Sequence, residues 1–316
     1  MLTYTELVKQ PVRLQALTSL RPDEFEALLP YFAEADAATQ SAKYTQTGQP
    51  RQRKPGGGSK ARLARLEDKL LFILIYQKTY PLQTAHGLLF GLSQSQTNEW
   101  LQRLLPVLHA ALTRAGYAPE RDPAHLGQRR AAPAKPLAVQ LDGTERPRQR
   151  PQNPAKQRAH YSGKKKFHTD KNVLLVDEDT RRVLYLSATR PGSLHDKKLA
   201  DDAALQFPRG SRLIQDTGFQ GYAPAHVHLI QPKKQMRGQW LSATDHIANR
   251  LKARARILVE HVVAGIKRCR TVKEVLRNRL PGFSDLVMDI ACALHNLRND
   301  FRYRRSPTYQ LKHYFR

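Results

Sequence analysis

The chain has 316 residues, which is room for about two domains of ordinary size. Lysine and arginine number 53 against 27 aspartate and glutamate residues, and a formal net charge of +26 points to a polyanionic partner such as nucleic acid. Only two cysteines and no apolar run of about 18 residues argue against a disulfide framework, a cysteine-based zinc site and a membrane partner, so we expect a cytoplasmic protein.

The N-terminal part predicts helices and then a flexible connection. Residues 1–42 form a small helical element, because apolar residues recur there at roughly helical spacing. Residues 43–61 are predicted to be a basic tether, since they are rich in lysine, arginine and glycine and contain no acid. A helical block is expected over 62–114. The next segment, 115–135, contains several prolines and is predicted to be a linker between domains.

The end of the helical block predicts two helices joined by a tight turn. Gly91 can adopt the left-handed conformation, and Ser93 followed by Gln96 has the spacing of a capping box. This is the arrangement of a helix-turn-helix, whose second helix enters the major groove of DNA. That helix would present Gln94, Gln96 and Asn98, whose amides are suited to reading adenine. An ordinary helical hairpin fits the same pattern, and the basic charge favours the DNA-binding interpretation.

The remaining sequence, 136–305, predicts a mixed sheet with helices packed on it. Short apolar runs predict strands at 137–141, 173–176, 183–186, 212–215 and 227–230. The turn-rich residues 177–180 predict a hairpin between the second and third of these strands. Helical periodicity is found at 199–205, 244–279 and 284–302. The predicted fold class is therefore α/β, with an all-helical region first and 306–316 left as a C-terminal tail.

Three carboxylates are candidates for metal-dependent chemistry. Asp142 and Asp216 each stand at the expected end of a strand, and Glu260 shares one side of a long helix with Arg256 and Lys267. Mg²⁺ prefers carboxylate oxygens, and two such ions about 3.5–4 Å apart serve many nucleases. Other interpretations stay open, because strand-end aspartates often form turns and Glu260 could simply pair with Arg256. Further acids compete as ligands: Asp177, Asp179, Asp201 and Asp202.

Basic residues gather near all three acids. Residues 143–171 contain nine lysines and arginines against two acids, and 233–256 contain seven against one. Such residues can hold DNA phosphates and position the bond to be cut. A merely solvated basic surface is the alternative, and the scarcity of acids argues against it. The candidates for DNA contact are Arg146, Arg148, Lys164, Lys165, Lys166, Lys233 and Lys234.

Five ordered motifs resemble the DDE-superfamily transposases of bacterial insertion sequences, above all the insertion-sequence-five family and its Harbinger-like relatives. The resemblance covers about residues 62–302, and the segment 65–105 is similar to the helix-turn-helix that precedes the catalytic domain in that family. The motifs are Leu141-Asp142-Gly143-Thr144, Tyr161 to Thr169, Pro191 to Asp196, Asp216 to Tyr222 and Arg256 to Glu260.

The resemblance implies an RNase H-like catalytic domain that uses two Mg²⁺ or Mn²⁺ ions per active site. In the order of the motif, Asp142, Asp216 and Glu260 match the three acids that hold the metal. Lys267 matches a basic residue that often follows the third acid, and Arg256 matches an arginine ahead of it. His195 and Asp196 match a motif to which we assign a supporting role. Thr217 and Asp170 depart from the family pattern, and neither departure removes a metal ligand.

The function implied by the resemblance is that of a DNA transposase in the bacterial cytoplasm, associated with the nucleoid. It would bind the terminal inverted repeats of its element, hydrolyse the ends and join the 3′-hydroxyls to target DNA. Because two ends are cut, a homodimer or higher oligomer is expected. Two alternatives stay open: a non-catalytic DNA-binding regulator derived from a transposase, and a metal-dependent endonuclease without strand transfer. The presence of all three acids argues against the regulator.

Overall fold

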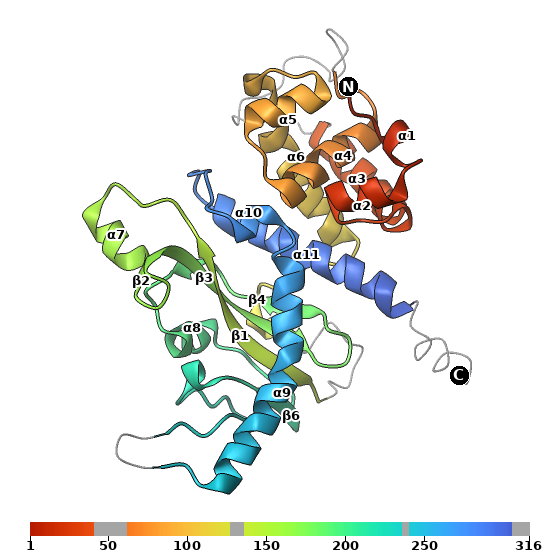
Figure 1. Ribbon diagram of the computed structural model, residues 1–316. Coiled ribbons are helices and arrows are strands. Elements are labelled where there is room, and N and C mark those ends of the chain that lie inside the picture. The colour runs from red at the N-terminus through yellow and green to blue at the C-terminus, as the bar shows by residue number, and fades with distance from the viewer. Residues whose placement is uncertain (41–61, 127–135, 236–239, 305–316) are drawn as a thin grey trace, which may run out of the picture. The chain divides into compact units, whose positions relative to one another are not determined.

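A computed structural model of the chain describes residues 1–40, 62–126, 136–235 and 240–304 (Figure 1). The predicted tether 43–61, residues 127–135 of the predicted linker and the predicted tail 306–316 lie outside the described residues. Contacts divide the chain into two compact units. The helical unit comprises Met1–Ala118, Arg268–Thr271 and Leu286–Leu294, and the sheet unit comprises the remaining residues.

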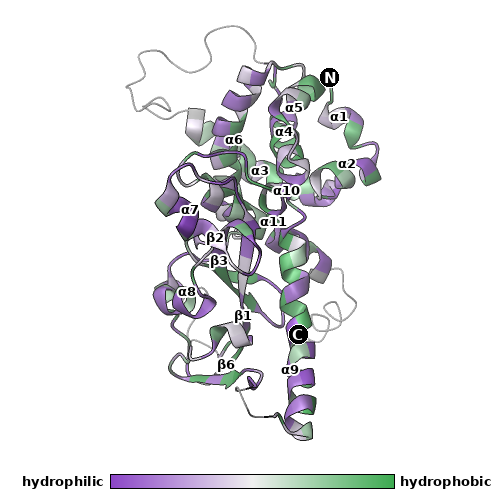
Figure 2. Cartoon of the chain, turned by 60° about the vertical axis from the view of Figure 1, so that its left-hand side comes forward, coloured by the Kyte–Doolittle hydropathy of each residue, from purple (hydrophilic) through white to green (hydrophobic). Residues whose placement is uncertain are grey.

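The helical unit is built around one fully covered helix. Its helices are α1 (Tyr4–Leu7), α2 (Pro11–Thr18), α3 (Pro22–Gln40), α4 (Leu66–Thr79), α5 (Gln83–Phe90) and α6 (Gln94–Arg114). All residues from Asp68 to Gln77 in α4 are buried, and residues 70–76 among them form an apolar run of two helical turns, as expected of a helix covered on every side. Figure 2 shows this helix in the colour of apolar residues. Buried Asp36 of α3 pairs with Lys69 of α4 at 2.7 Å and Arg103 of α6 at 3.2 Å, so one carboxylate links three helices.

The predicted turn and capping box between α5 and α6 are confirmed. Gly91 ends α5 in the left-handed conformation, with φ of +65°. The Ser93 hydroxyl accepts a hydrogen bond from the Gln96 backbone at 3.2 Å, and the Gln96 side-chain oxygen accepts one from the Ser93 backbone at 3.0 Å. Because the two bonds satisfy donors that a helix start leaves unpaired, they fix where α6 begins.

The sheet unit contains the predicted mixed sheet. Its strands are β1 (Ala138–Pro147), β2 (Tyr161–Ser162), β3 (Phe167–Asp177), β4 (Val183–Leu186), β5 (Arg190–Pro191), β6 (Ser211–Ile214) and β7 (Val227–Ile230). The spatial order is β2-β3-β1-β6-β7, with β4 and β5 also paired to β3. β3 and β4 form the predicted antiparallel hairpin, whereas β6 runs parallel to β1 and to β7. The predicted α/β class is confirmed, and the mixed sheet is consistent with an RNase H-like fold.

Helices cover both faces of this sheet (Figure 1). The helices beyond the linker are α7 (Pro154–His160), α8 (Asp196–Ala203), α9 (Ala243–Ile266), α10 (Arg270–Lys273) and α11 (Phe283–Arg304), with short 3-10 turns at Pro123–His125 and Thr217–Phe219. On one face, Val139 and Leu141 of β1 pack with Leu199 and Ala200 of α8 in the core. On the other, the Gln140 amide of β1 donates to the Ala255 carbonyl of α9 at 2.8 Å. Among the described residues, no helix has the length and apolar character that crossing a membrane requires.

The prediction of continuous helix over 244–279 is wrong. α9 ends at Ile266, and the short α10 follows after a break. The reason lies in the next residues, which belong to the helical unit: Cys269 is buried, and the Thr271 hydroxyl donates to the Gln77 side chain of α4 at 2.6 Å. Because the chain passes from the sheet unit to the helical unit at Arg268, the helical periodicity in the sequence covers two separate helices, α9 and α10.

Candidate active site

Asp142 and Asp216 come together because β1 and β6 are neighbouring parallel strands. The last paired residues are Gln140 and Ile214, and each acid comes two residues later in its own segment. The prediction that the strand ends at Asp142 is wrong, since β1 continues to Pro147 as an antiparallel partner of β3. From Asp142 onward, no described strand pairs with β1 on the side where β6 lies. Asp216 caps the turn that follows β6 and accepts a hydrogen bond from the Gly218 backbone at 2.8 Å.

Arg256 of α9 lies between these two carboxylates. Gln140 contacts α9, and alternate residues of a strand face the same way, so Asp142 also faces that helix. One nitrogen of the Arg256 guanidinium is 3.7 Å from Asp142 Oδ1 and 3.6 Å from Asp216 Oδ2. The guanidinium therefore occupies a position suited to a cation shared by both acids.

Burial and neighbouring charges act on the carboxyl group of Asp142 in opposite directions. Burial raises the pKa of Asp142 to about 6, Arg256 opposes the rise, and the charges of Asp216 and Asp196 add to it. The donors around Asp142 are carboxylate oxygens, the ligands that hard divalent cations such as Mg²⁺ prefer. The carboxylate donors of Asp142 and Asp216 thus fit a divalent cation, and the Arg256 guanidinium lies close to both of them.

Asp196 is a member of this group that the sequence analysis treated as only supporting. It begins α8, on the other face of the sheet, and reaches the acids through space left by two glycines. A Cβ on Gly143 would lie 2.7 Å from Asp196 Oδ1, and a Cβ on Gly218 would lie 3.0 Å from Asp196 Oδ2. The glycine shortly after each acid, at 143 and 218, is the sequence feature that could have indicated a third group here.

Glu260 and Lys267 lie further along α9. Glu260 is exposed one turn after Arg256, and its side chain forms no hydrogen bond or ion pair among the described residues. Within the described part of the chain, no three histidine, cysteine, aspartate or glutamate side chains are arranged as metal ligands, so the three predicted acids are not assembled around one point. Lys267 follows the end of α9. Burial lowers its pKa and the charge of Asp142 acts in the opposite direction, which places Lys267 within electrostatic range of Asp142.

The candidates for DNA contact differ in their surroundings. Arg146 is only 3% exposed, and its guanidinium donates to Asn172, Ser284 and Thr189. This burial gives Arg146 a structural role, in contrast to the predicted DNA contact. The others lie at or near the surface: Lys164, Lys165 and Lys166 in the turn before β3, Lys233 paired with Asp245 at 2.8 Å, Lys234 exposed, and Arg148 half-buried beside Asp170.

The residues expected to read bases share a hydrogen-bond network at the start of α6. The Gln94 side chain donates to the Gln83 side chain of α5 at 2.5 Å, and Gln83 donates to Asn98 at 3.0 Å. Gln83 thus orients both predicted reading residues. Gln96 is placed differently, because its side-chain oxygen is engaged in the capping box.

Comparison with known proteins assigns both units to one superfamily. Residues 141–296 match the family described as DDE superfamily endonuclease, and residues 61–114 match the helix-turn-helix of that superfamily. A protein of Microchaete diplosiphon, named as a probable transposase for insertion sequence element IS702, is 28% identical over 214 residues, which are 68% of this chain and 74% of the relative. A protein of Streptomyces albus G, named as a putative transposase for insertion sequence element IS112, is 28% identical over 238 residues, 73% of this chain and 80% of the relative. No solved structure matches this chain significantly.

The matched regions contain the features already described. The endonuclease match includes Asp142, Asp196, Asp216 and Glu260, and the helix-turn-helix match includes α4, α5 and α6. Endonucleases of this superfamily generally use divalent metal ions, in agreement with the carboxylate donors beside Arg256. The chain therefore belongs to the DDE superfamily of endonucleases, the superfamily of insertion-sequence transposases.

Proposed function

We propose that this protein binds the terminal repeats of its own insertion sequence, hydrolyses the phosphodiester bonds at the ends and joins the freed 3′-hydroxyls to target DNA. The observation that carries this proposal is the convergence of Asp142 and Asp216 beside Arg256, in a unit that matches a DDE endonuclease. The helix-turn-helix in the same chain supplies a means of choosing DNA. Because two ends have to be cut, the functional assembly is a homodimer or higher oligomer on DNA.

The acids of the site would hold two divalent cations, Mg²⁺ or Mn²⁺. Asp142 and Asp216 are common to both possible ligand sets. Asp196, which lies beside Gly143 and Gly218, would complete one set, and Glu260, which the family resemblance implies, would complete the other once DNA is bound. When bound, such cations supply stabilisation of negative charge on the attacking and leaving oxygens. Arg256 and Lys267 are the basic groups of the site that can hold the scissile phosphate.

A cleavage assay on element-end duplex DNA tests this function. With Mg²⁺ present, we expect a nick at the element boundary that leaves a 3′-hydroxyl, followed by joined products when target DNA is added. With EDTA, neither product should form. Binding without any cleavage would favour the DNA-binding regulator, and cleavage without joining would favour the endonuclease without strand transfer.

The raised pKa of Asp142 predicts a pH dependence. A carboxyl group binds a cation only when it is deprotonated, so metal affinity should fall as the pH drops through about 6. We expect the Mn²⁺ dissociation constant of the metal-free protein to rise about tenfold for each pH unit below that point. Titration calorimetry from pH 5 to 8 would measure this. An affinity that stays constant down to pH 5 would contradict the assigned role of Asp142.

The Gln83 network predicts which substitutions in the helix-turn-helix alter sequence preference. Gln94→Ala should cost about 1–3 kcal/mol on element-end DNA and little on random DNA. Gln83→Ala should reduce the same preference, although Gln83 need not contact a base, because it orients Gln94 and Asn98. Competition binding with both DNAs measures the ratio, and Glu99→Gln on the exposed side of α6 is the matched control. Unchanged ratios in both variants would exclude this end of α6 as the base reader.

A further inference from the structure

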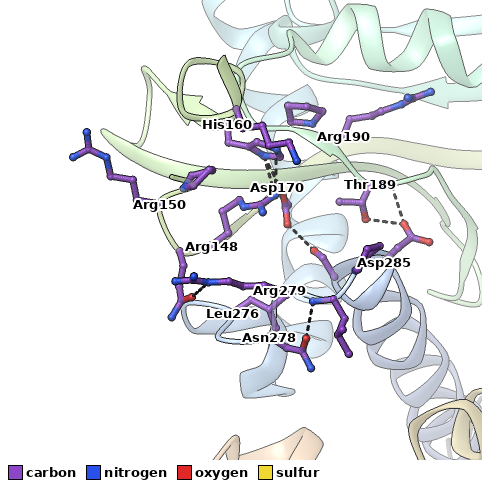
Figure 3. Close-up of a pocket in the computed structure, with 18 of the residues that line it drawn as sticks. Arg148, Arg150, His160, Asp170, Thr189, Arg190, Leu276, Asn278, Arg279 and Asp285 are labelled. Carbon is purple, nitrogen blue, oxygen red and sulfur yellow. Dashed lines mark hydrogen bonds and ion pairs between the residues drawn. The ribbon is translucent and has the colours of Figure 1, made fainter. Parts of the chain in front are cut away.

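A pocket of about 770 Å³ lies in the sheet unit, next to the C-terminal end of β1 (Figure 3). Its walls come from separate parts of the sequence: the segment after β1, α7, the start of β5 and the residues that lead into α11. Arg148, Arg150 and Lys156 lie in the basic run 143–171 that was expected to hold DNA phosphates, whereas Arg190 and Arg279 lie outside it. Six cationic or potentially cationic side chains line the pocket, namely Arg148, Arg150, Lys156, His160, Arg190 and Arg279.

A buried carboxylate organises the base of the pocket. Asp170 accepts from Arg148 at 2.8 Å and from the Ser284 hydroxyl at 2.7 Å, and it lies 3.1 Å from His160. Burial alone would raise the pKa of Asp170, but the hydrogen bonds from His160 and Ser284, with the charges of Arg148 and Arg146, bring it to about 2. Asp170, which departs from the family pattern, is therefore a fixed counter-ion inside the pocket.

The other acid at the pocket is also neutralised. Asp285 pairs with Arg121 at 2.6 Å, and its second oxygen accepts from the Thr189 hydroxyl at 2.7 Å. Neither acid is thus available to balance the outer cations. Because both carboxylates are already paired, the pocket as a whole presents excess positive charge to whatever enters it.

Four cations around the pocket keep their charge unbalanced. They are Arg150, Lys156, Arg190 and Arg279; all are exposed, and none forms an ion pair with a described carboxylate. Two of them are nevertheless held in position. Arg150 donates to the Gln157 amide at 3.0 Å, and Arg279 donates to the Gln149 amide at 2.8 Å. A neutral amide fixes the direction of a guanidinium without cancelling its charge, which suits recognition of an anion.

The position of the pocket relates it to the acids on β1. Arg148 follows Asp142 by six residues, so it faces the same side of the strand and lies about 20 Å away along it. That distance corresponds to about six base pairs of duplex DNA. The pocket is also far larger than one phosphate group, and its cations come from four segments of the chain.

We propose that this pocket binds backbone phosphates of the DNA duplex whose scissile bond lies at Asp142 and Asp216, about six base pairs from that bond. The proposal rests on the proposed function, since it assumes that the acids act on DNA. It adds a second anchor on the sheet unit, which would fix the direction of the duplex relative to the acids. A single bound phosphate cannot fix that direction, whereas two separated contacts can.

The test compares two double variants that remove equal charge. Arg190→Ser with Arg279→Ser removes two pocket cations. Arg181→Ser with Arg209→Ser removes two exposed arginines outside the pocket, neither of which has an ion pair among the described residues. Arg148 is left intact, because its removal would leave the buried Asp170 carboxylate without its arginine partner. Binding of element-end duplex is measured in EDTA at several salt concentrations, so the result does not depend on cleavage.

We expect the pocket variant to lower the slope of log affinity against log salt by about 0.9 for each phosphate that the protein no longer neutralises, about 1.8 in total. The control variant should keep the wild-type slope and the same melting temperature. Ethylation of phosphates about six base pairs from the nick should weaken binding of the wild type and have little further effect on the pocket variant.

Equal slopes for the wild type and the pocket variant would overturn the proposal, even if the wild type cleaves DNA. Saturable binding of inorganic phosphate without a change in the DNA slope would assign the pocket to a small anion and would also overturn it. Conversely, a lowered slope in a protein that never cleaves DNA would support the pocket while contradicting the proposed transposase activity.

Discussion

Replacing Asp142 or Asp216 by asparagine is expected to lower metal-dependent DNA cleavage by about three orders of magnitude or more. Each substitution would remove one negative ligand of the proposed cations, and both carboxylates lie within 3.7 Å of the Arg256 guanidinium. Single-turnover nicking of element-end duplex in Mg²⁺ measures the decrease. DNA binding in EDTA should persist and even tighten, since a carboxylate that faces phosphate repels it.

A change in stability separates this expectation from misfolding. The pKa of Asp142 in the folded protein is about 6, above its ordinary value of 3.8. The folded state therefore binds the proton more tightly than the unfolded state, and its stability decreases as the pH rises from about 4 to about 6. At pH 8 without metal, Asp142→Asn should raise the free energy of unfolding by about 1–3 kcal/mol. A variant that cleaves at the wild-type rate would exclude the proposed role of the acid, whatever its stability.

Replacing Asp196 by asparagine should weaken binding of Mn²⁺ to the DNA-free protein by about 10–100-fold. The reason is its position beside Gly143 and Gly218, where its carboxylate adds to the negative charge around Asp142. Glu260→Gln should leave this affinity unchanged, because Glu260 is exposed and makes no described contact with the acids. Both variants should cleave DNA slowly if Glu260 joins the site only with DNA bound. Electron paramagnetic resonance of free Mn²⁺ measures the affinity without any reaction.

Asp201→Asn provides a control on the same helix as Asp196. Asp201 is exposed on α8 and pairs with Lys197 at 2.6 Å, so its replacement changes the charge of the helix without touching the acids. Its Mn²⁺ affinity should equal that of the wild type. Wild-type affinity in Asp196→Asn, together with a weakened affinity in Glu260→Gln, would reverse the assignment and restore the three acids of the sequence motif as the complete set.

The features that could be predicted from the sequence depend on local chemistry or on strand order. The capping box at Ser93 and Gln96 is a contact between residues three apart, and the hairpin of β3 and β4 follows from apolar runs around a polar turn. The expectation that Asp142 and Asp216 are metal ligands required no knowledge of packing, because it came from the sequence motifs around them. Where such short-range rules apply, the sequence contains the whole argument.

The features that could not be predicted depend on partners far away in the sequence. Arg146 looks like a surface cation, yet it is buried because Asn172 and Ser284 accept its hydrogen bonds. β1 extends past Asp142 only because β3 remains beside it. Asp196 lies near the other acids because Gly143, 53 positions earlier in the sequence, has no side chain in its way. Such a long-range contact cannot be predicted from the periodicity of the sequence. Each case is decided by tertiary contact rather than by propensity.

The position of Arg256 has a consequence for the order in which ligands bind. One Arg256 nitrogen lies within 3.7 Å of both carboxylates, so the guanidinium occupies the place that a cation shared by the two acids would take. A cation that took the place of Arg256 would release it toward DNA, and DNA that attracted Arg256 would vacate the place for the cation. Under thermodynamic linkage the two ligands must then strengthen each other's binding by the same factor. Arg256 would thereby couple the binding of metal to the binding of DNA, so that each ligand is bound more tightly when the other is present.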